Sequence, residues 1–375
     1  MDAGKTKIAA IALVAVLAVA AVAAVLMLSD KGKGPGDGGN GAPFNVSIID
    51  ASGTNVTITE APRRIVSGAP MISEMVAALG LTDRLMAVTD YCDFPAAITA
   101  LRDNGSTIGG FFNPSYEKVI SFNPDLIILD SGVQAQTDMA AQLRGAGYTV
   151  ILLYPASDLE SVYKNIGMVG NATGTQDIGG PMVSRMKAQV EDIANAVASE
   201  SQPNIMFVTY ADEGFTNVWP AGGTTSIGEI IDLAGGKNVF ESMSGYEMAS
   251  NEVLMDKSST VDVIIMTVMY SPETPENKSA WFKADPIWKE SPAVKNNKVY
   301  YLTGQAENIF NRESVRTVDA VQLLAEILHP DAFASKVPYS ADAINLIGDE
   351  YTDYLPSGTA SQVGSVTIMA AVARD

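Results

Sequence analysis

Hydrophobic residues follow two alternating patterns between residues 45 and 355. Short runs rich in Val, Ile and Leu predict buried strands, whereas hydrophobic residues at every third or fourth position predict helices. The predicted strands are 64–67, 85–88, 126–129, 149–153, 205–208, 263–268 and 299–302, and the clearest helical stretches are 71–79, 138–145 and 315–328. Alternation of this kind is typical of α/β layers built on largely parallel sheets.

One helical stretch, 176–199, is longer than the others and contains no strand signal. Its hydrophobic positions are Ile178, Met182, Met186, Val190, Ile193 and Val197. That spacing places them in one stripe along a helix. We therefore expect a single long helix between two α/β regions.

Several residues indicate where other helices begin and end. Gly80 and Gly235 each follow a helical stretch, where a left-handed residue commonly ends a helix. The Asn-Pro pair at 113–114 predicts a helix start, because Asn caps helices well and Pro fits the first turn. Ser226 and Glu229 have the spacing of a capping box, so we expect a helix to begin there.

The two halves of the chain repeat one arrangement. Glu117 begins a predicted helix, and Asp125 then precedes the strand 126–129. In the second half Glu252 begins a helix and Asp262 precedes the strand 263–268. Two similar lobes joined by one helix suggest a ligand-binding cleft between them.

These patterns predict an α/β protein with two similar α/β lobes joined by a single long helix, preceded by an N-terminal transmembrane helix. The expected divisions are an anchor at 1–28, a Gly-rich tether at 29–44, an N-terminal lobe at 45–172, a connecting helix at 173–202, a C-terminal lobe at 203–355 and a tail at 356–375. No role is assigned to the tail.

The apolar run 8–28 is uninterrupted and is long enough to cross about 30 Å of hydrocarbon as a helix. Lys5 and Lys7 precede it, so the positive-inside rule places the rest of the chain outside the cell. A cleaved signal peptide is the alternative, although its apolar region is commonly about 7–15 residues. No cysteine that could carry a lipid follows the run.

Five Asn-x-Ser/Thr sequons fit an extracytoplasmic location, at Asn45, Asn55, Asn104, Asn171 and Asn277. The composition bears on the partners. The chain has 43 acidic and 24 basic residues and a net charge of −19, which argues against nucleic acid or anionic lipid as a partner. The single cysteine, Cys92, excludes an intramolecular disulfide. The single histidine, His329, is expected at the end of helix 315–328 and leaves no cluster of metal-binding imidazoles.

Seven segments together resemble the solute-binding proteins of ABC importers for iron-siderophores, haem and vitamin B12. They are 61–66, 73–80, 91–95, 109–114, 117–127, 232–240 and 252–264, within a match that covers roughly 62–328. No segment is diagnostic by itself, but their order and spacing agree with that family. The resemblance implies two lobes joined by a rigid helix, and a non-enzymatic protein without a cofactor or resident metal.

The resemblance also implies partners and site residues. Glu117 and Glu252 match the acidic residues that dock such proteins onto the ABC permease, which works with its ATPase subunits. The positions that match the ligand-binding cleft are Pro70, Tyr91 and Phe111 in the first lobe, and Trp219, Tyr246, Phe310 and Arg312 in the second. Aromatic walls suit a large planar or chelated ligand, and an arginine suits an anionic group.

The expected function is capture of a metal chelate, an iron-siderophore or a cobalamin, and its delivery to a permease. A receptor for haem or for a free metal ion is the alternative, and a surface enzyme is a weaker one, because G-x-S-x-G, H-E-x-x-H and Walker motifs are missing from the sequence. The Gly-rich turn 222–226 could hold an anion at a helix N-terminus. We interpret it as a packing turn, because it lacks the lysine of a P-loop.

Overall fold

The computed structural model describes residues 44–215, 217–268, 273–357 and 359. The predicted anchor at 8–28 and nearly all of the tail lie outside these residues. Within them, no helix combines the length and the hydrophobicity needed to span a bilayer. The chain separates into a unit of residues 1–43 and a unit of residues 44–375, and the second unit is described below.

The N-lobe comprises the described elements from β1 to α6, which surround a four-stranded parallel sheet of order β4-β3-β5-β6. Its strands are β1 (Val46–Ile49), β2 (Asn55–Ile58), β3 (Ile65–Ser67), β4 (Leu85–Ala87), β5 (Leu126–Asp130) and β6 (Val150–Leu153). Its helices are α2 (Pro70–Ala78), η1 (Thr82–Arg84), α3 (Ala96–Asp103), α4 (Tyr116–Ser121), α5 (Gln134–Gly145) and α6 (Leu159–Thr173). Strands β1 and β2 form a separate antiparallel hairpin.

The C-lobe comprises the described elements from β7 to η4, around a six-stranded sheet of order β12-β11-β10-β7-β8 in which β9 also pairs with β7. Its strands are β7 (Asn204–Ala211), β8 (Val218–Pro220), β9 (Lys237–Asn238), β10 (Val263–Thr267), β11 (Val299–Leu302) and β12 (Asn345–Ile347). Its helices are η2 (Glu213–Phe215), α8 (Ser226–Leu233), α9 (Asn251–Ser258), α10 (Pro275–Ala284), η3 (Trp288–Glu290), α11 (Pro292–Lys295), α12 (Gly304–Asn311), α13 (Thr317–Leu328), α14 (Pro330–Phe333) and η4 (Asp349–Asp353). Among the described residues of this sheet, only β8 runs antiparallel to its neighbour, and the other strand pairs are parallel.

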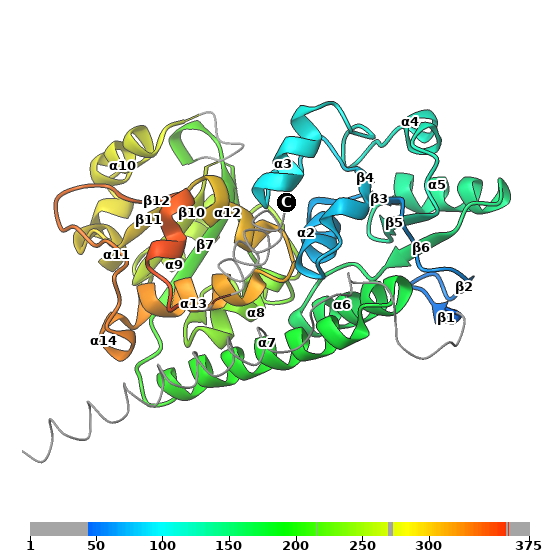
Figure 1. The fold of residues 1–375 in the computed structure, drawn as a ribbon. Coiled ribbons are helices and arrows are strands. Elements are labelled where there is room, and N and C mark those ends of the chain that lie inside the picture. Colours follow the sequence, from blue (N-terminus) through cyan, green and yellow to red (C-terminus); the bar gives the residue numbers. More distant parts are fainter. Residues whose placement is uncertain (1–43, 216, 269–272, 358, 360–375) are drawn as a thin grey trace, which may run out of the picture. The chain divides into compact units, whose positions relative to one another are not determined.

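Helix α7 (Gln176–Val197) runs beneath both lobes and confirms the predicted long helix (Figure 1). Met186, Ile193 and Val197 of its stripe are buried. The stripe lies in a hydrophobic core that also contains one face of each sheet, including Ile65 in the N-lobe and Ile205 in the C-lobe. Because alternate strand residues point to opposite faces, the other face of each sheet packs into a separate core. One continuous core therefore connects the two lobes.

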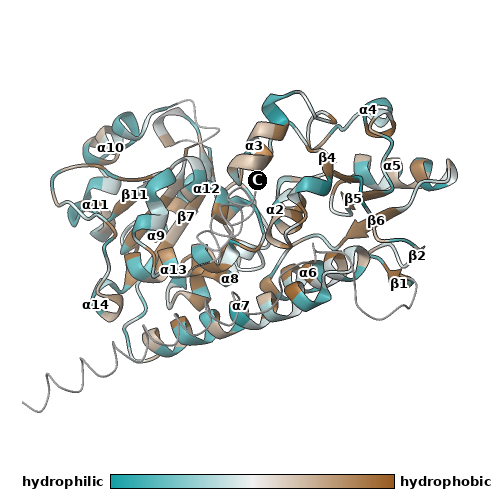
Figure 2. Cartoon of the chain, viewed as in Figure 1, coloured by the Kyte–Doolittle hydropathy of each residue, from teal (hydrophilic) through white to brown (hydrophobic). Residues whose placement is uncertain are grey.

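The hydrophobic residues of the central strands lie inside both lobes, as Figure 2 shows. Strands β5 and β10 are buried at every position, as their uninterrupted apolar runs predict for strands covered on both faces. Gly80 and Gly235, with φ of 76° and 77°, follow helices α2 and α8 as predicted. His329 is the C-cap of α13 and its Nε2 lies 3.2 Å from the carbonyl oxygen of Gly235, so the predicted helix-end position is confirmed.

Two predicted helix caps are wrong, although α8 begins at Ser226 as expected. The Asn-Pro pair at 113–114 does not begin a helix, because α4 starts at Tyr116 and Ser115 is its N-cap, accepting a hydrogen bond from the Lys118 amide. Ser226 and Glu229 do not form a capping box. Thr225 caps α8 through the Gly228 amide, and Glu229 instead accepts a hydrogen bond from the Leu159 amide at the start of α6.

Candidate functional site

Helices α4 and α9 repeat the same local structure in the two lobes. Ser115 caps α4 and Ser250 caps α9, each with its hydroxyl oxygen 3.3 Å from the amide three residues later. Glu117 and Glu252 therefore occupy the second position of their helices, where the helix dipole favours a negative charge. Both side chains are exposed.

The aspartates that follow these helices confirm the internal repeat at atomic detail. Asp125 donates its amide to the Arg64 carbonyl, and its carboxylate accepts from the Arg64 amide at 2.9 Å. Asp262 makes the same two bonds with Asn204, at 2.8 and 2.9 Å. In each lobe the aspartate joins the beginnings of two adjacent parallel strands, β3 with β5 and β7 with β10. The repeat therefore fixes α4 and α9 at equivalent places in the two lobes.

Tyr91 and Phe111, the predicted aromatic site residues of the N-lobe, lie close together. A Cβ atom on Gly110 would come within 3.7 Å of the Tyr91 ring, so the loop containing Phe111 packs against Tyr91. Tyr91 is 49% exposed, and Phe111 is partly buried against Phe112, with ring centroids 4.8 Å apart. Tyr91 therefore has aromatic surface available to a ligand, and of the adjacent phenylalanines Phe112 is the more exposed.

Trp219 and Tyr246, the predicted aromatic site residues of the C-lobe, lie on adjacent segments. Val218 pairs with Ala249, and the Gly222 amide donates to the Gly245 carbonyl, so these two stretches run side by side. Trp219 is 38% exposed and Tyr246 is 43% exposed. Each lobe thus presents accessible aromatic surface.

Pro70 and Phe310 are placed differently from these aromatic residues. Pro70 is buried at the first position of α2. Phe310 is 1% exposed and packs against Phe207 in the hydrophobic core, with ring centroids 5.1 Å apart. In this conformation neither offers a ligand appreciable surface, and no local signal in the sequence distinguishes a buried phenylalanine from one that lines a cleft.

Arg312, predicted to meet an anionic ligand group, is paired with the N-lobe. Its guanidinium forms an ion pair with Asp93, with Nη2 at 3.2 Å from Oδ2, and it donates to the Tyr91 carbonyl at 3.2 Å. Burial raises the pKa of Asp93, but the hydrogen bonds and charge of Arg312 outweigh this effect and leave the pKa lowered. An anion could reach this arginine only in competition with Asp93.

A second ion pair between the lobes was not predicted from the sequence. Arg316 of the C-lobe donates to Glu74 of α2 from Nε at 2.9 Å and from Nη2 at 2.5 Å. Ser314 donates to the same carboxylate at 2.5 Å, and Arg316 also stacks on the Phe94 ring at 3.9 Å. Glu74 and Arg316 are 2% and 1% exposed. We call the contacts of Glu74 and Asp93 with Arg312, Ser314 and Arg316 the interlobe clasp.

Two carboxyl groups near the interlobe clasp have raised pKa values. Burial raises the pKa of Glu313, partly offset by a hydrogen bond that Ser226 donates at 2.5 Å, while the charge of Asp130 raises it further. Burial also raises the pKa of Asp130, at the carboxyl end of β5. The same Glu313 charge adds to the burial that raises the pKa of Tyr246. Asp130 and Glu313 belong to different lobes, so these charge effects place Tyr246 near the junction of the lobes.

Gln136 is a further residue that the sequence did not single out. It is fully buried, and its Nε2 donates to the carbonyls of Gly68 and Phe111 at 2.9 and 2.8 Å. Its Oε1 accepts from the Asp130 amide at 2.9 Å. Gln136 thereby joins the segment after β3 and the end of β5 to the loop containing Phe111. It positions the candidate ligand loop.

The Gly-rich turn before α8 is a packing turn, as interpreted from the sequence. The amides of Gly222 and Gly223 donate to the carbonyls of Gly245 and Met243, each at 3.0 Å. A Cβ atom on Gly222 would lie 2.4 Å from the Met243 oxygen, and one on Gly223 would lie 2.1 Å from the Glu241 oxygen. These amides are therefore occupied by backbone, and the close approach requires glycine.

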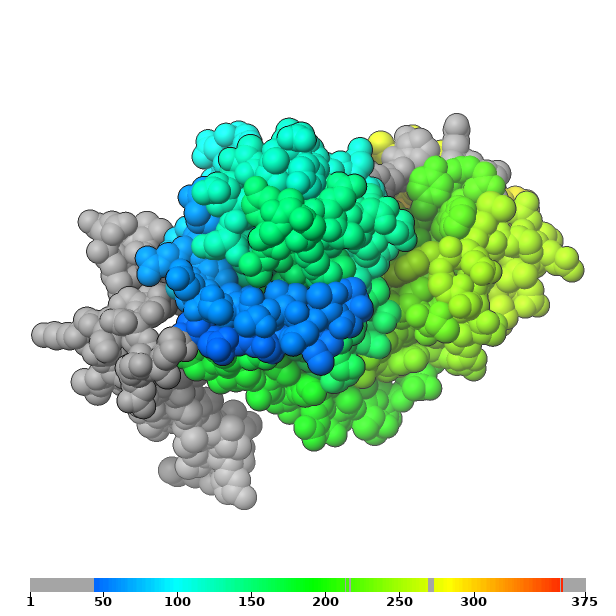
Figure 3. Space-filling view, turned by 90° about the vertical axis from the view of Figure 1, so that its right-hand side faces the viewer, coloured from blue at the N-terminus to red at the C-terminus, as the bar shows by residue number. Residues whose placement is uncertain are grey.

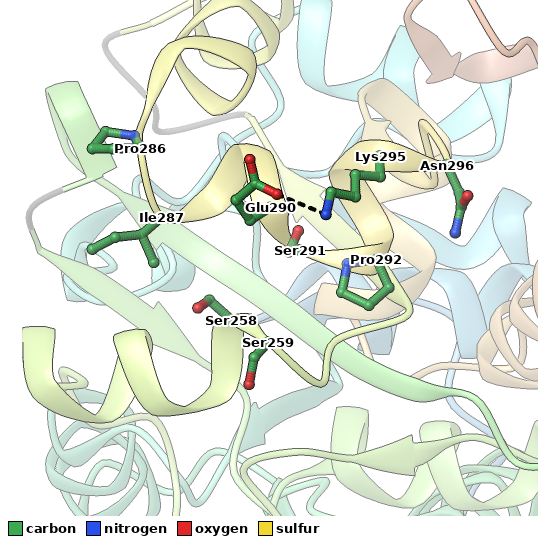
Figure 4. A pocket seen from close by; sticks show the side chains of 9 residues that line it. All are labelled: Ser258, Ser259, Pro286, Ile287, Glu290, Ser291, Pro292, Lys295 and Asn296. Carbon is green, nitrogen blue, oxygen red and sulfur yellow. Dashed lines mark ion pairs between the residues drawn. The ribbon is translucent and has the colours of Figure 1, made fainter.

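A surface pocket of about 540 Å³ lies elsewhere, between the end of α9, η3 and α11 (Figure 4). Its nine lining residues include Ser258, Ile287 and the Glu290–Lys295 ion pair, and none is a predicted ligand residue. Among the described residues, no group of three or more His, Cys, Asp or Glu side chains is placed to hold a metal ion.

Comparison with known proteins identifies the family. Residues 65–306 match the family described as periplasmic binding protein. An uncharacterized ABC transporter substrate-binding lipoprotein of Bacillus subtilis is 29% identical over 77% of this chain and 87% of its own length. A cobalamin-binding protein of Halobacterium salinarum is 25% identical over 78% of this chain and 76% of its own.

A solved structure agrees with these relatives. A periplasmic haem-binding protein in complex with two haems is 26% identical, with a TM-score of 0.60, over 72% of this chain and 98% of its own. Proteins of this family are non-enzymatic components of transport, and their two-lobed α/β fold is the one described above. The chain belongs to the periplasmic binding protein family and is an extracytoplasmic solute-binding protein of an ABC importer.

Proposed function

We propose that the protein binds a metal chelate, a cobalamin-type corrinoid or a ferric siderophore, between its lobes and delivers it to an ABC permease. The observation that carries this proposal is the accessible aromatic surface on both lobes, at Tyr91 in one and at Trp219 and Tyr246 in the other. Aromatic side chains supply large apolar area at low entropic cost, which suits a bulky ligand with flat faces. The names of the relatives and structural neighbours support a chelate as the cargo.

A titration with three defined ligands tests the cargo. Soluble protein starting at residue 45 is titrated with cyanocobalamin, with a ferric hydroxamate siderophore and with haem, following tryptophan fluorescence. We expect one of the first two to bind and quench Trp219. Binding of haem alone would replace the proposed cargo by haem, and binding of Zn²⁺ or Mn²⁺ but of none of the three chelates would overturn the proposal.

Alanine variants locate the binding site. Tyr91→Ala and Trp219→Ala should each weaken binding about tenfold or more, because each removes a large contact near the junction of the lobes. Tyr339→Ala is the matched control, because Tyr339 is 54% exposed and outside the aromatic site. Equal affinities for all three variants and the parent would place the ligand elsewhere.

We also propose that Glu117 and Glu252 dock the two lobes onto the permease. Their equivalent positions on α4 and α9, both exposed, support two equivalent contacts with cationic groups of the partner. The variant with Glu117→Ala and Glu252→Ala should keep its ligand affinity and lose uptake in vesicles containing the permease and its ATPase subunits. Glu191→Ala with Glu200→Ala, two exposed glutamates of the α7 region, is the control. Normal uptake by the first variant would contradict docking through these residues.

We further propose that the apolar run 8–28 anchors the protein as a membrane helix. The Bacillus relative is a lipoprotein by name, but the cysteine of this sequence, Cys92, is buried in the N-lobe and cannot carry such a lipid. A chain starting at residue 45 should move from the membrane fraction to the soluble fraction with unchanged ligand affinity. Cleavage of the native chain after about residue 28, detected by N-terminal sequencing, would contradict the anchor.

A further inference from the structure

The five sequon asparagines have a common environment, although they are far apart in the sequence. Asn45 and Asn55 belong to the β1–β2 hairpin region, Asn104 caps the end of α3, Asn171 lies in α6, and Asn277 lies in the first turn of α10. All five are exposed. Each could therefore accept a saccharide without disturbing the core, as a modification of this size requires.

The side-chain amides of these five asparagines are also free of hydrogen bonds to the described part of the chain. Other asparagines are used differently. Asn165, Asn238 and Asn345 are 1–2% exposed, and their amides donate to the carbonyls of Tyr154, Ala221 and Asn297. The sequon asparagines are thus separated from structural asparagines by both exposure and bonding.

The five sequons fall into two groups according to the exposure of the Ser or Thr that lies two residues after the asparagine. Ser47 and Thr57 are exposed, and Ser106 and Ser279 are partly exposed. Thr173, which follows Asn171, is 2% exposed and donates to the Val169 carbonyl at 2.7 Å. A transferase that recognises the hydroxyl together with the amide would find both in the folded protein at four sequons, but not at Asn171.

The four accessible sequons lie outside the elements and segments of the proposed functional surfaces. None belongs to α4 or α9 or to the segments that contain Tyr91, Trp219 and Tyr246. The β1–β2 hairpin, which contributes two of them, lies across the outer surface of the N-lobe, where Figure 3 shows it in blue.

We propose that Asn45, Asn55, Asn104 and Asn277 carry N-linked saccharides and that Asn171 does not. The donor is a saccharide on a lipid phosphate or diphosphate, presented outside the cytoplasmic membrane. The side-chain nitrogen attacks the anomeric carbon, and the new N–C bond forms as the bond from that carbon to the phosphate oxygen breaks. The lipid phosphate leaves with the electron pair, and the amide nitrogen loses one proton to a base of the transferase.

Mass spectrometry of the full chain, purified from membranes of the organism that produces it, tests this proposal. We expect peptides with Asn45, Asn55, Asn104 and Asn277 to carry a saccharide mass and the Asn171 peptide to carry none. Each Asn→Gln variant at the four sites should remove one saccharide from the intact mass, whereas Asn171→Gln should change only the amino acid.

Ser106→Ala is the sharper variant, because it keeps Asn104 and removes only the hydroxyl of the sequon. It should abolish the saccharide on Asn104 and leave the other three in place. Unmodified asparagine at the four sites would overturn the proposal, as would equal occupancy of Asn171. These outcomes are independent of which cargo the protein binds.

Discussion

The two lobes share their internal scaffold, but their surface residues differ. In both, an aspartate joins the starts of two parallel strands, and a serine-capped helix presents a glutamate at its second position. On the surface, Lys118 follows Glu117 in α4, whereas the exposed Val253 follows Glu252 in α9. The repeat therefore specifies where a contact can be made, and the neighbouring residues specify its chemistry.

The difference is greatest where the lobes meet. The N-lobe contributes the carboxylates of Glu74 and Asp93 to the interlobe clasp, and the C-lobe contributes the guanidinium groups of Arg312 and Arg316. Two identical surfaces would have brought like charges together. The lobes of this protein are thus similar inside and complementary in charge at their contact.

The largest effect is expected from breaking this complementarity. Glu74→Ala leaves Arg316 as a buried, uncompensated charge, so it should lower the free energy of unfolding by about 3–5 kcal/mol. The double variant Glu74→Leu with Arg316→Met removes both charges and should be close to the parent. Urea unfolding measures both, and a loss below about 1 kcal/mol for Glu74→Ala would show that the pair does not hold the lobes.

The shared scaffold can be tested by removing its aspartates one at a time. The Asp125 carboxylate accepts two backbone amides, from Arg63 and Arg64, whereas that of Asp262 accepts one, from Asn204. Asp125→Ala should therefore cost about 1–2 kcal/mol and Asp262→Ala roughly half as much. Asp125→Asn keeps an acceptor and serves as the control. The reverse order of the two alanine variants in urea unfolding would contradict this difference.

Two carboxyl groups, Asp93 in the N-lobe and Glu313 in the C-lobe, should also respond to pH in opposite directions. The pKa of Asp93 is lowered, so its pairing with Arg312 stabilises the fold above the ordinary value of 3.8 and is lost as pH falls through the lower folded value. The pKa of Glu313 is raised above 4.5, so its contribution is complete below 4.5 and is lost as pH rises through the folded value.

Melting temperatures measured from about pH 3 to 8 should separate these two groups. Asp93→Asn should reduce the fall in melting temperature at the acid end of this range. Glu313→Gln should raise the melting temperature at neutral pH, because it removes the cost of ionising a poorly solvated carboxyl group. A lower melting temperature for Glu313→Gln at neutral pH would contradict the second assignment.

The smallest effect on stability is expected from exchanging the surfaces of the docking helices. Lys118→Val with Val253→Lys should change the free energy of unfolding by less than about 0.5 kcal/mol, because both positions are exposed. It should nevertheless alter the salt dependence of binding to the permease, because a positive charge moves from one lobe to the other. An unchanged salt dependence would show that these two residues lie outside the docking surface.

The sequence predicted the scaffold well because its signals are local. Uninterrupted apolar runs identify β5, β10 and β11, and the stripe of six hydrophobic residues identifies α7 to within two residues of its end. Helix α6 was not predicted, since Gly167 and Gly170 inside it weaken the helical pattern. Its stability comes from packing against α7 and the continuous core.

The sequence by itself determined seven of the twelve described strands, the long helix, the internal repeat and, through the resemblance, the family. Only the tertiary structure decided which side chains meet. Glu74 and Arg316 are 242 residues apart, and neither has a local pattern that predicts an ion pair. Phe310 is apolar like an exposed aromatic site residue, yet Phe207 and the core cover it. Periodicity is a property of neighbouring residues, whereas burial and pairing depend on segments that only folding brings together.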